Sequence, residues 1–298
     1  MKQPRVIVLA GYGLNCETET AAAFTLAGGN TDIVHINDLV GNGRDCSLLK
    51  YQILAIPGGF SYGDDTGSGR AYANKLKNHL QNQLREFVNK DKLVIGICNG
   101  FQILTNTGLL PGALTFNDNA RYTDRWVDLK INDRVIASLK SKTKGEAILP
   151  PKKIASTFAE ATADRSAALA MTQKSPWLTG IKKLMLPIAH GEGKYYATDD
   201  IIKALKKDRA IAATYTSGEI CKYQNLPKNP NGSLLDIAAI TGYNGRVLGI
   251  MPHPERAMFF TQLPNWPLLK EKLLRAGKPL PKYGPGLQIF KNAVNYFN

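Results

Sequence analysis

The stretch Lys92-Leu-Val-Ile-Gly-Ile-Cys98-Asn-Gly-Phe-Gln-Ile-Leu-Thr-Asn-Thr107 decides the fold. Its first half is a nearly continuous apolar run, typical of a buried parallel strand, and the residues from Phe101 to Leu104 then follow a helical spacing. Between them lies Gly96-Ile97-Cys98-Asn99-Gly100, a G-x-nucleophile-x-G pattern with cysteine in place of serine. An abrupt strand-to-helix turn strains the backbone of the nucleophile and leaves no room for side chains beside it, which explains the two glycines.

This turn would place the Cys98 sulfur at the carboxyl edge of the sheet, at the amino end of a helix. The helix dipole and the free N–H groups there favour a thiolate over a thiol, and they can hold a developing oxyanion. A buried structural cysteine beside a tight turn is the alternative on this pattern alone. The rest of the chain therefore has to decide between a nucleophile and a core residue.

Composition limits the classes of protein that fit. The chain has 298 residues, 44% of them hydrophobic, which suffices for one large core or two modest ones, and no apolar run is long enough to span a bilayer. Four scattered cysteines without a C-x-x-C pattern suit a reducing cytoplasm, and the four histidines have no zinc-binding spacing, so we expect no metal site.

The formal net charge of +14 raises the question of nucleic-acid binding. The lysine clusters, however, lack the interleaved aromatic residues and the motifs of known nucleic-acid-binding folds. A solvated basic surface, or one that faces an acidic partner protein, fits better. We therefore expect neither a nucleic-acid nor a membrane partner.

Strands and helices alternate through the first hundred residues. Strands are predicted at Val6 to Ala10, Asp32 to Ile36 and Gln52 to Ile56, and helices at about Thr18 to Ala27 and Ala71 to Lys90. This order predicts an α/β fold, with an open, mostly parallel, doubly wound sheet and helices on both of its faces. The turn from Gly11 to Cys16 is a weak match to a dinucleotide site, because Cys16 stands at the third small position, and a β-α turn is favoured there.

Two Gly-rich loops follow predicted strands and are candidates for substrate contacts. Pro57-Gly58-Gly59-Phe60 lets backbone N–H groups approach a substrate oxygen, so Gly59 is a candidate oxyanion donor together with the Asn99 N–H, although a simple tight turn is the alternative. A strand at Leu184 to Ile188 leads into Ala189-His190-Gly191-Glu192-Gly193, where a histidine and an acid could hold a zwitterionic ligand. A polar turn with an exposed His190 is the alternative there.

The last decisive stretch runs from Asp236 to Arg256. Two predicted strands, Ile237 to Ile240 and Arg246 to Met251, are joined by a turn with an Asn-Gly pair and form an antiparallel hairpin. The second strand runs into Pro252-His253-Pro254-Glu255-Arg256, and residues two apart in an extended backbone project to the same face. His253 could therefore take the thiol proton of Cys98 while Glu255 orients the imidazole.

One segment stands apart from this pattern. Residues from about 141 to 174 are rich in lysine and then in alanine, serine and threonine, and they contain no visible chemistry. We expect a surface insert there, within a single domain that spans residues 1–298.

Taken together, these segments resemble the class I (triad-type) glutamine amidotransferases, and within them the glutaminase subunits of phosphoribosylformylglycinamidine synthases of purine biosynthesis. The matching segments cover nearly the whole chain except the insert and roughly residues 259–283, and they are Gly13 to Cys16, Val34 to Asp38, Ile56 to Asp64, Gly96 to Leu104, Gly108 to Gly112, Leu186 to Gly193, Asn231 to Ser233 and Gly249 to Ala257. The stretch Asp64 to Gly69 departs from the family pattern.

The resemblance implies specific roles for residues of this chain. Cys98 would be the nucleophile, with His253 and Glu255 as its triad partners. The backbone of Gly59 and Asn99 would bind the oxyanion. Three further residues would contact glutamine, namely Gln102, His190 and Glu192.

The resemblance also implies partners. Ammonia released from glutamine would pass to a synthetase subunit that converts formylglycinamide ribonucleotide to the amidine, with ATP and magnesium on that subunit, and a small bridging subunit would join the complex. No nucleotide-binding motif appears here, so no cofactor is expected in this chain. The alternatives are an amidotransferase subunit that serves another synthetase, and a cysteine peptidase or chaperone-like relative on the same fold.

Overall fold

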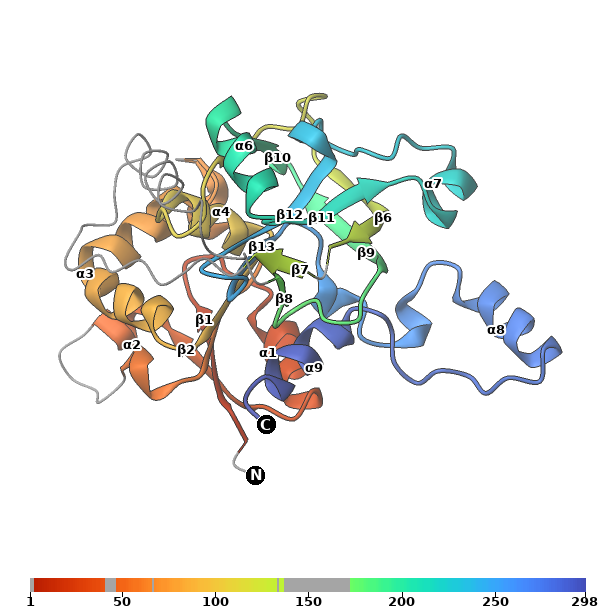
Figure 1. Ribbon diagram of the computed structural model, residues 1–298, viewed down its shortest axis with the longest axis horizontal. Helices are drawn as coiled ribbons and strands as arrows, with labels where there is room; N and C mark the ends of the chain where they lie inside the picture. The colour runs from red at the N-terminus through yellow and green to blue at the C-terminus, as the bar shows by residue number, and fades with distance from the viewer. Residues whose placement is uncertain (1–2, 41–46, 66, 133, 137–171) are drawn as a thin grey trace.

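A computed structural model describes residues 3–40, 47–65, 67–132, 134–136 and 172–298. Within these residues the main sheet has nine strands in the order β2-β1-β3-β4-β13-β12-β11-β6-β9. Figure 1 shows this sheet running through the centre of the molecule. No helix in the described part of the chain is long and apolar enough to cross a membrane.

The first five strands of this order are parallel to one another. They are β2 (Asn30–His35), β1 (Arg5–Ala10), β3 (Ile53–Ile56), β4 (Leu93–Ile97) and β13 (Val247–Ile250). Every residue of β3, β4 and β13 is buried, as expected for parallel strands covered on both faces. The carboxyl ends of these strands lie at one edge, where ligands bind in open α/β sheets.

The remaining four strands are antiparallel. They are β12 (Ile237–Gly242), β11 (Ile211–Thr216), β6 (Thr123–Ile131) and β9 (Lys183–His190). Two short pairs lie outside the main sheet, β5 (Ala113–Thr115) with β10 (Lys194–Tyr196) and β7 (Arg134–Ile136) with β8 (Thr172–Lys174).

Helices cover both faces of the parallel part (Figure 1). Helices α1 (Glu17–Leu26) and α9 (Leu287–Asn295) pack together, with the Phe24 and Phe290 rings edge to face at 4.9 Å. Helices α2 (Ile36–Val40), α3 (Arg70–Asn89) and α4 (Asn99–Asn106) lie on the other side.

Three further helices follow later in the chain. They are α6 (Asp199–Lys207), α7 (Glu219–Gln224) and α8 (Trp266–Arg275). Helix α8 projects from the body and has no buried side chain (Figure 1).

The predicted fold class is confirmed, and so is the antiparallel hairpin, which β12 and β13 form. The antiparallel part is larger than a hairpin, because β11, β6 and β9 continue the same sheet. The alternating sequence from Arg121 to Ile131 is typical of an exposed strand, but β6 lies between two neighbouring strands, and its Val127 and Leu129 are fully buried. The predicted insert at about 141–174 lies outside the described residues except for Thr172–Lys174, which form β8.

Candidate active site

Cys98 occupies a strained turn between β4 and α4. Its backbone has φ 50° and ψ −107°, a conformation that non-glycine residues rarely adopt, and its side chain is buried. The glycines on either side are required by space, since a Cβ on Gly100 would lie 1.9 Å from the Ile56 carbonyl oxygen and one on Gly96 would lie 2.4 Å from the Gly100 carbonyl oxygen. The G-x-C-x-G pattern therefore produces the tight turn that it predicts.

The register of the sheet brings His253 to the same edge. Ile97 of β4 and Ile250 of β13 are partners in adjacent parallel strands, so the residues that follow them emerge side by side. The Cys98 N–H donates to the Ile250 carbonyl at 2.8 Å, and the His253 N–H donates to the Pro187 carbonyl at 2.9 Å. Cys98 and His253, 155 positions apart in sequence, are thus fixed by main-chain hydrogen bonds at neighbouring strand ends.

His253 and Glu255 form a buried pair. Nδ1 of His253 lies 2.5 Å from Oε1 of Glu255, and the two residues are 3% and 1% exposed. Burial alone would lower the pKa of His253, but the interactions with Glu255, Cys98 and Cys16 outweigh it and hold that pKa well above its ordinary value. Because Nδ1 faces the carboxylate, Nε2 is the imidazole atom left for proton transfer, and it has no hydrogen-bond partner among the described residues.

The two predicted oxyanion donors lie at this edge, Asn99 at the start of a helix and Gly59 in a loop. Asn99 is the first residue of α4, so its N–H has no acceptor within the helix. Gly59 has φ 151°, and a Cβ on it would lie 2.2 Å from the Gly13 carbonyl oxygen. The neighbouring Phe60 N–H is already bound to that carbonyl at 2.8 Å, which leaves the Gly59 N–H as the better candidate in this loop.

His190 is buried behind the site and uncharged. Its Nδ1 lies 3.1 Å from Oδ1 of Asn117, and a Cβ on Gly193 would lie 2.3 Å from the ring, so glycine is needed there. Burial, reinforced by the charge of His253, lowers the pKa of His190 to about 3. The alternative of a polar turn with an exposed His190 is wrong, because this residue is only 2% exposed.

Gln102 and Glu192 are linked to each other. The Gln102 amide donates from Nε2 to the Glu192 carbonyl at 2.6 Å and accepts at Oε1 from the Asn99 side chain at 2.7 Å. A direct contact of Gln102 with glutamine would therefore have to replace one of these bonds. The Glu192 carboxylate accepts from the Ser68 N–H at 3.4 Å and lies near Asp64, whose pKa is raised by burial and by that charge.

The sequence patterns do not indicate three residues that contact the site, namely Asn117, Cys16 and Arg256. Asn117 holds His190, and the sulfur of Cys16 accepts a hydrogen bond from Nη2 of Arg256 at 3.1 Å. A signal for Cys16 was present, because the turn from Gly11 to Cys16 follows β1, whose carboxyl end lies at the same sheet edge.

One group of side chains has the composition of a metal site. Single donor atoms of Cys16, His253 and Glu255 all lie within 4.8 Å of one another. The Arg256 guanidinium already donates a hydrogen bond to the Cys16 sulfur, and its positive charge would repel a metal cation bound there. These residues therefore do not fit a resident metal ion.

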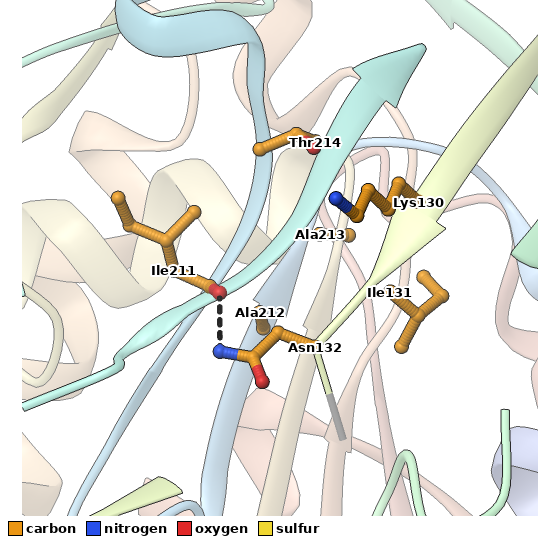
Figure 2. A pocket seen from close by; sticks show the side chains of 7 residues that line it. All are labelled: Lys130, Ile131, Asn132, Ile211, Ala212, Ala213 and Thr214. Carbon is orange, nitrogen blue, oxygen red and sulfur yellow. Dashed lines mark hydrogen bonds between the residues drawn. The ribbon is translucent and has the colours of Figure 1, made fainter. Parts of the chain in front are cut away.

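A shallow hollow lies elsewhere on the sheet, between β6 and β11. Residues 130–132 and 211–214 line it, and the Asn132 side chain donates to the Ile211 carbonyl at 3.4 Å (Figure 2). None of the predicted site residues lines this hollow, so it contributes nothing to the chemistry at Cys98.

Comparison with known proteins gives three findings. The family model for the CobB/CobQ-like glutamine amidotransferase domain matches residues 3–157 and 151–297. Phosphoribosylformylglycinamidine synthase subunit PurQ of Methanococcus maripaludis (strain C7) is 42% identical and is aligned over 99% of this chain and 98% of its own length, and the protein of the same name from Dehalococcoides mccartyi is 35% identical over 99% and 98%. The structure of PurLQS from Thermotoga maritima matches with a TM-score of 0.60 and 25% identity, over the full length of both chains.

Proposed function

The chain belongs to the CobB/CobQ-like glutamine amidotransferase family, and from this membership we infer that it is the glutaminase subunit of a phosphoribosylformylglycinamidine synthase. It hydrolyses glutamine to glutamate and ammonia for purine biosynthesis. The observation that carries the catalytic part of this proposal is the convergence of Cys98 and the His253–Glu255 pair at adjacent strand ends.

The first half of the reaction forms a thioester. The Cys98 sulfur, after its proton has passed to His253, attacks the side-chain amide carbon of glutamine. The oxyanion that forms accepts hydrogen bonds from the Gly59 and Asn99 N–H groups. The His253 imidazolium then gives its proton to the departing nitrogen, so that ammonia leaves and a γ-glutamyl thioester remains on Cys98.

The second half returns the enzyme to its starting state. His253, now neutral, takes a proton from water, and the hydroxide attacks the thioester carbon. The tetrahedral species collapses, glutamate leaves and the Cys98 thiolate is restored. Glu255 keeps Nε2 of His253 directed at the reacting atoms through both halves, because it holds Nδ1 at 2.5 Å.

Glu192 and the buried His190 would hold the amino-acid end of glutamine. Glu192 supplies a negative charge suited to the ammonium group, and the neutral His190 supplies a hydrogen-bonding ring without adding a competing charge. Gln102 would orient Glu192 through its bond to the Glu192 carbonyl.

The released ammonia requires an acceptor. We propose that a synthetase subunit, carrying ATP and magnesium, receives it and makes formylglycinamidine ribonucleotide, and that a small bridging subunit completes the complex. We also propose a cytoplasmic location, because Cys16, Cys98 and Cys221 are free thiols, which persist in a reducing compartment.

Replacing Cys98 with alanine tests the function. The variant should lose glutamine-dependent synthesis in the reconstituted complex by at least ~1,000-fold, since no nucleophile remains. Ammonia-dependent synthesis should be unchanged, which controls for folding and assembly. Glutaminase turnover that persists in Cys98→Ala would refute the proposal.

A further inference from the structure

Cys16 has no part in the reaction described above, yet it lies inside the site. Its side chain is 2% exposed, and its sulfur, a His253 nitrogen and a Glu255 oxygen all lie within 4.8 Å of one another. A Cβ on Gly58 would lie 3.4 Å from this sulfur and 2.7 Å from Cε1 of His253, so the cysteine and the imidazole share one wall.

The backbone fixes the position of this sulfur. Cys16 precedes the first residue of α1, and its N–H donates to the Gly58 carbonyl at 3.1 Å. Its own carbonyl accepts from the Thr20 N–H at 3.1 Å and from the Thr20 hydroxyl at 2.7 Å. The turn that carries Cys16 is therefore joined both to the Gly58 loop and to the first turn of α1.

Arg256 directly follows Glu255 but points elsewhere. Its Nη2 donates to the Cys16 sulfur at 3.1 Å and lies 3.6 Å from Oε1 of Glu19. Oε2 of Glu255 is buried and has no hydrogen-bond partner in the part of the chain that the structure describes. An arginine beside such a carboxylate ordinarily forms a paired hydrogen bond with it, so something must hold the guanidinium away.

We propose that Cys16 is a positioning residue that, with Glu19, keeps the Arg256 guanidinium from pairing with Glu255, so that the carboxylate hydrogen-bonds His253 and not Arg256. If the guanidinium reached Oε2 of Glu255, its positive charge would offset the negative charge that stabilises the imidazolium. The pKa of His253 would then be lower. At high pH the imidazolium would lose its proton to solvent before it could protonate the departing nitrogen of glutamine, so the loss of activity would be largest there.

None of the other titratable groups described around His253 could take over the role of Cys16 as the acceptor for Arg256. The titratable side chains that face His253 are Glu255 from its own turn, Cys98 from the turn after β4, Cys16 from the turn before α1, His190 from the end of β9 and Tyr122 just before β6. Of these, only Cys16 accepts a hydrogen bond from Arg256 among the described contacts.

Four variants test the proposal. Cys16→Ala removes the acceptor of Arg256, Cys16→Ser keeps a smaller one, and Cys16→Ala combined with Arg256→Met removes the guanidinium as well. Cys221→Ser is the matched control, because Cys221 is also a buried free thiol but lies in α7 and donates to the Thr216 carbonyl. All four keep the nucleophile.

Two readouts are measured across pH 6 to 10, namely kcat/KM for glutamine in the reconstituted complex and the rate at which a chloroketone analogue of glutamine alkylates Cys98. In Cys16→Ala we expect kcat/KM at pH 9 to fall about tenfold, with the alkaline limb of both profiles at lower pH and KM little changed. Cys16→Ser and the control should keep the normal profile. The double variant should recover to within about threefold of the parent.

The result for the double variant is decisive. If it shows the same loss and the same profile as Cys16→Ala, the effect does not pass through Arg256 and the proposal is wrong. An unchanged profile in Cys16→Ala, or a loss in Cys16→Ser equal to that in Cys16→Ala, would also overturn it. The proposal rests on the proposed function for its kcat/KM readout, whereas Cys98 alkylation tests it even if Cys98→Ala shows that the glutaminase assignment is wrong.

Discussion

Replacing Gly58 with alanine should displace the imidazole of His253. A Cβ at this position would lie 2.7 Å from Cε1 and 3.3 Å from Nδ1 of the ring. The Gly58 backbone lies outside the left-handed region, so alanine is tolerated there and the effect is confined to packing. Gly58→Ala therefore perturbs the geometry of the site without removing any of its functional groups.

The size of the effect follows from the contact distance. Two carbon atoms pack at about 3.5 Å, so relief of the 2.7 Å contact requires the ring to move by about 0.8 Å. A displacement near 1 Å in an active site lowers the rate by about 100-fold. We expect kcat to fall roughly 30- to 100-fold, with KM within about threefold because His190 and Glu192 are not touched.

The assay is glutamate release by the reconstituted complex, with ammonia-dependent synthesis as the control for assembly. Gly242→Ala is the matched variant, since its Cβ, at the hairpin end of β12, would meet the end of the Leu110 side chain at 3.1 Å and the Leu109 carbonyl oxygen at an ordinary 3.5 Å. It should retain activity within about twofold, as for substitutions away from the site. A folded Gly58→Ala variant with a parental kcat would refute the placement of His253 against Gly58.

Three further perturbations have defined outcomes. Glu255→Gln should lower kcat/KM by about 100- to 10,000-fold and move the alkaline limb of the pH profile to lower pH, because the Glu255 carboxylate raises the pKa of His253 and its loss lowers that pKa; an unmoved limb would contradict this. Gly100→Ala should destabilise the fold by on the order of 3 kcal/mol in urea unfolding or prevent folding, since its Cβ would lie 1.9 Å from the Ile56 carbonyl oxygen; parental stability would contradict that contact. The imidazole signals of His190 should show no titration between pH 5 and 8, because its pKa is about 3. Since the unfolded chain takes up this proton near pH 6.5, His190 should make unfolding easier as the pH falls below that value, and titration near pH 6.5 by NMR would count against its burial.

The elements with strong local periodicity could be predicted from the sequence. The helix expected at Ala71 to Lys90 is α3, Arg70–Asn89, and the strand expected before Cys98 is β4, Leu93–Ile97. In both, the apolar residues are spaced so that they fall on the face that the fold buries, and this local spacing is enough to predict the type of element.

The order of strands in the antiparallel part could not be predicted. The alternation from residue 121 to 131 indicates a strand, but not that β11 and β9 flank it and bury Val127. Those neighbours come from residues about 50 to 90 positions later, and pairing over such distances leaves no local mark on the sequence.

In the candidate site, too, local patterns could be predicted from the sequence and contacts between distant residues could not. The flanking glycines predict Cys98 as a candidate nucleophile, and the spacing in an extended turn predicts His253 and Glu255 as its partners, all from local patterns. The contact of Cys16 with Arg256 joins residues 240 positions apart, so nothing near either residue predicts it.

The most direct test of the account is to locate the reactive thiol. The purified protein is treated with a chloroketone analogue of glutamine, and the adduct is mapped by peptide mass spectrometry. We predict one adduct, on Cys98, which glutamine prevents and which forms at least ~100-fold more slowly in His253→Ala. Labelling of Cys16 or Cys221 in preference to Cys98, or an undiminished rate on Cys98 in His253→Ala, would contradict it.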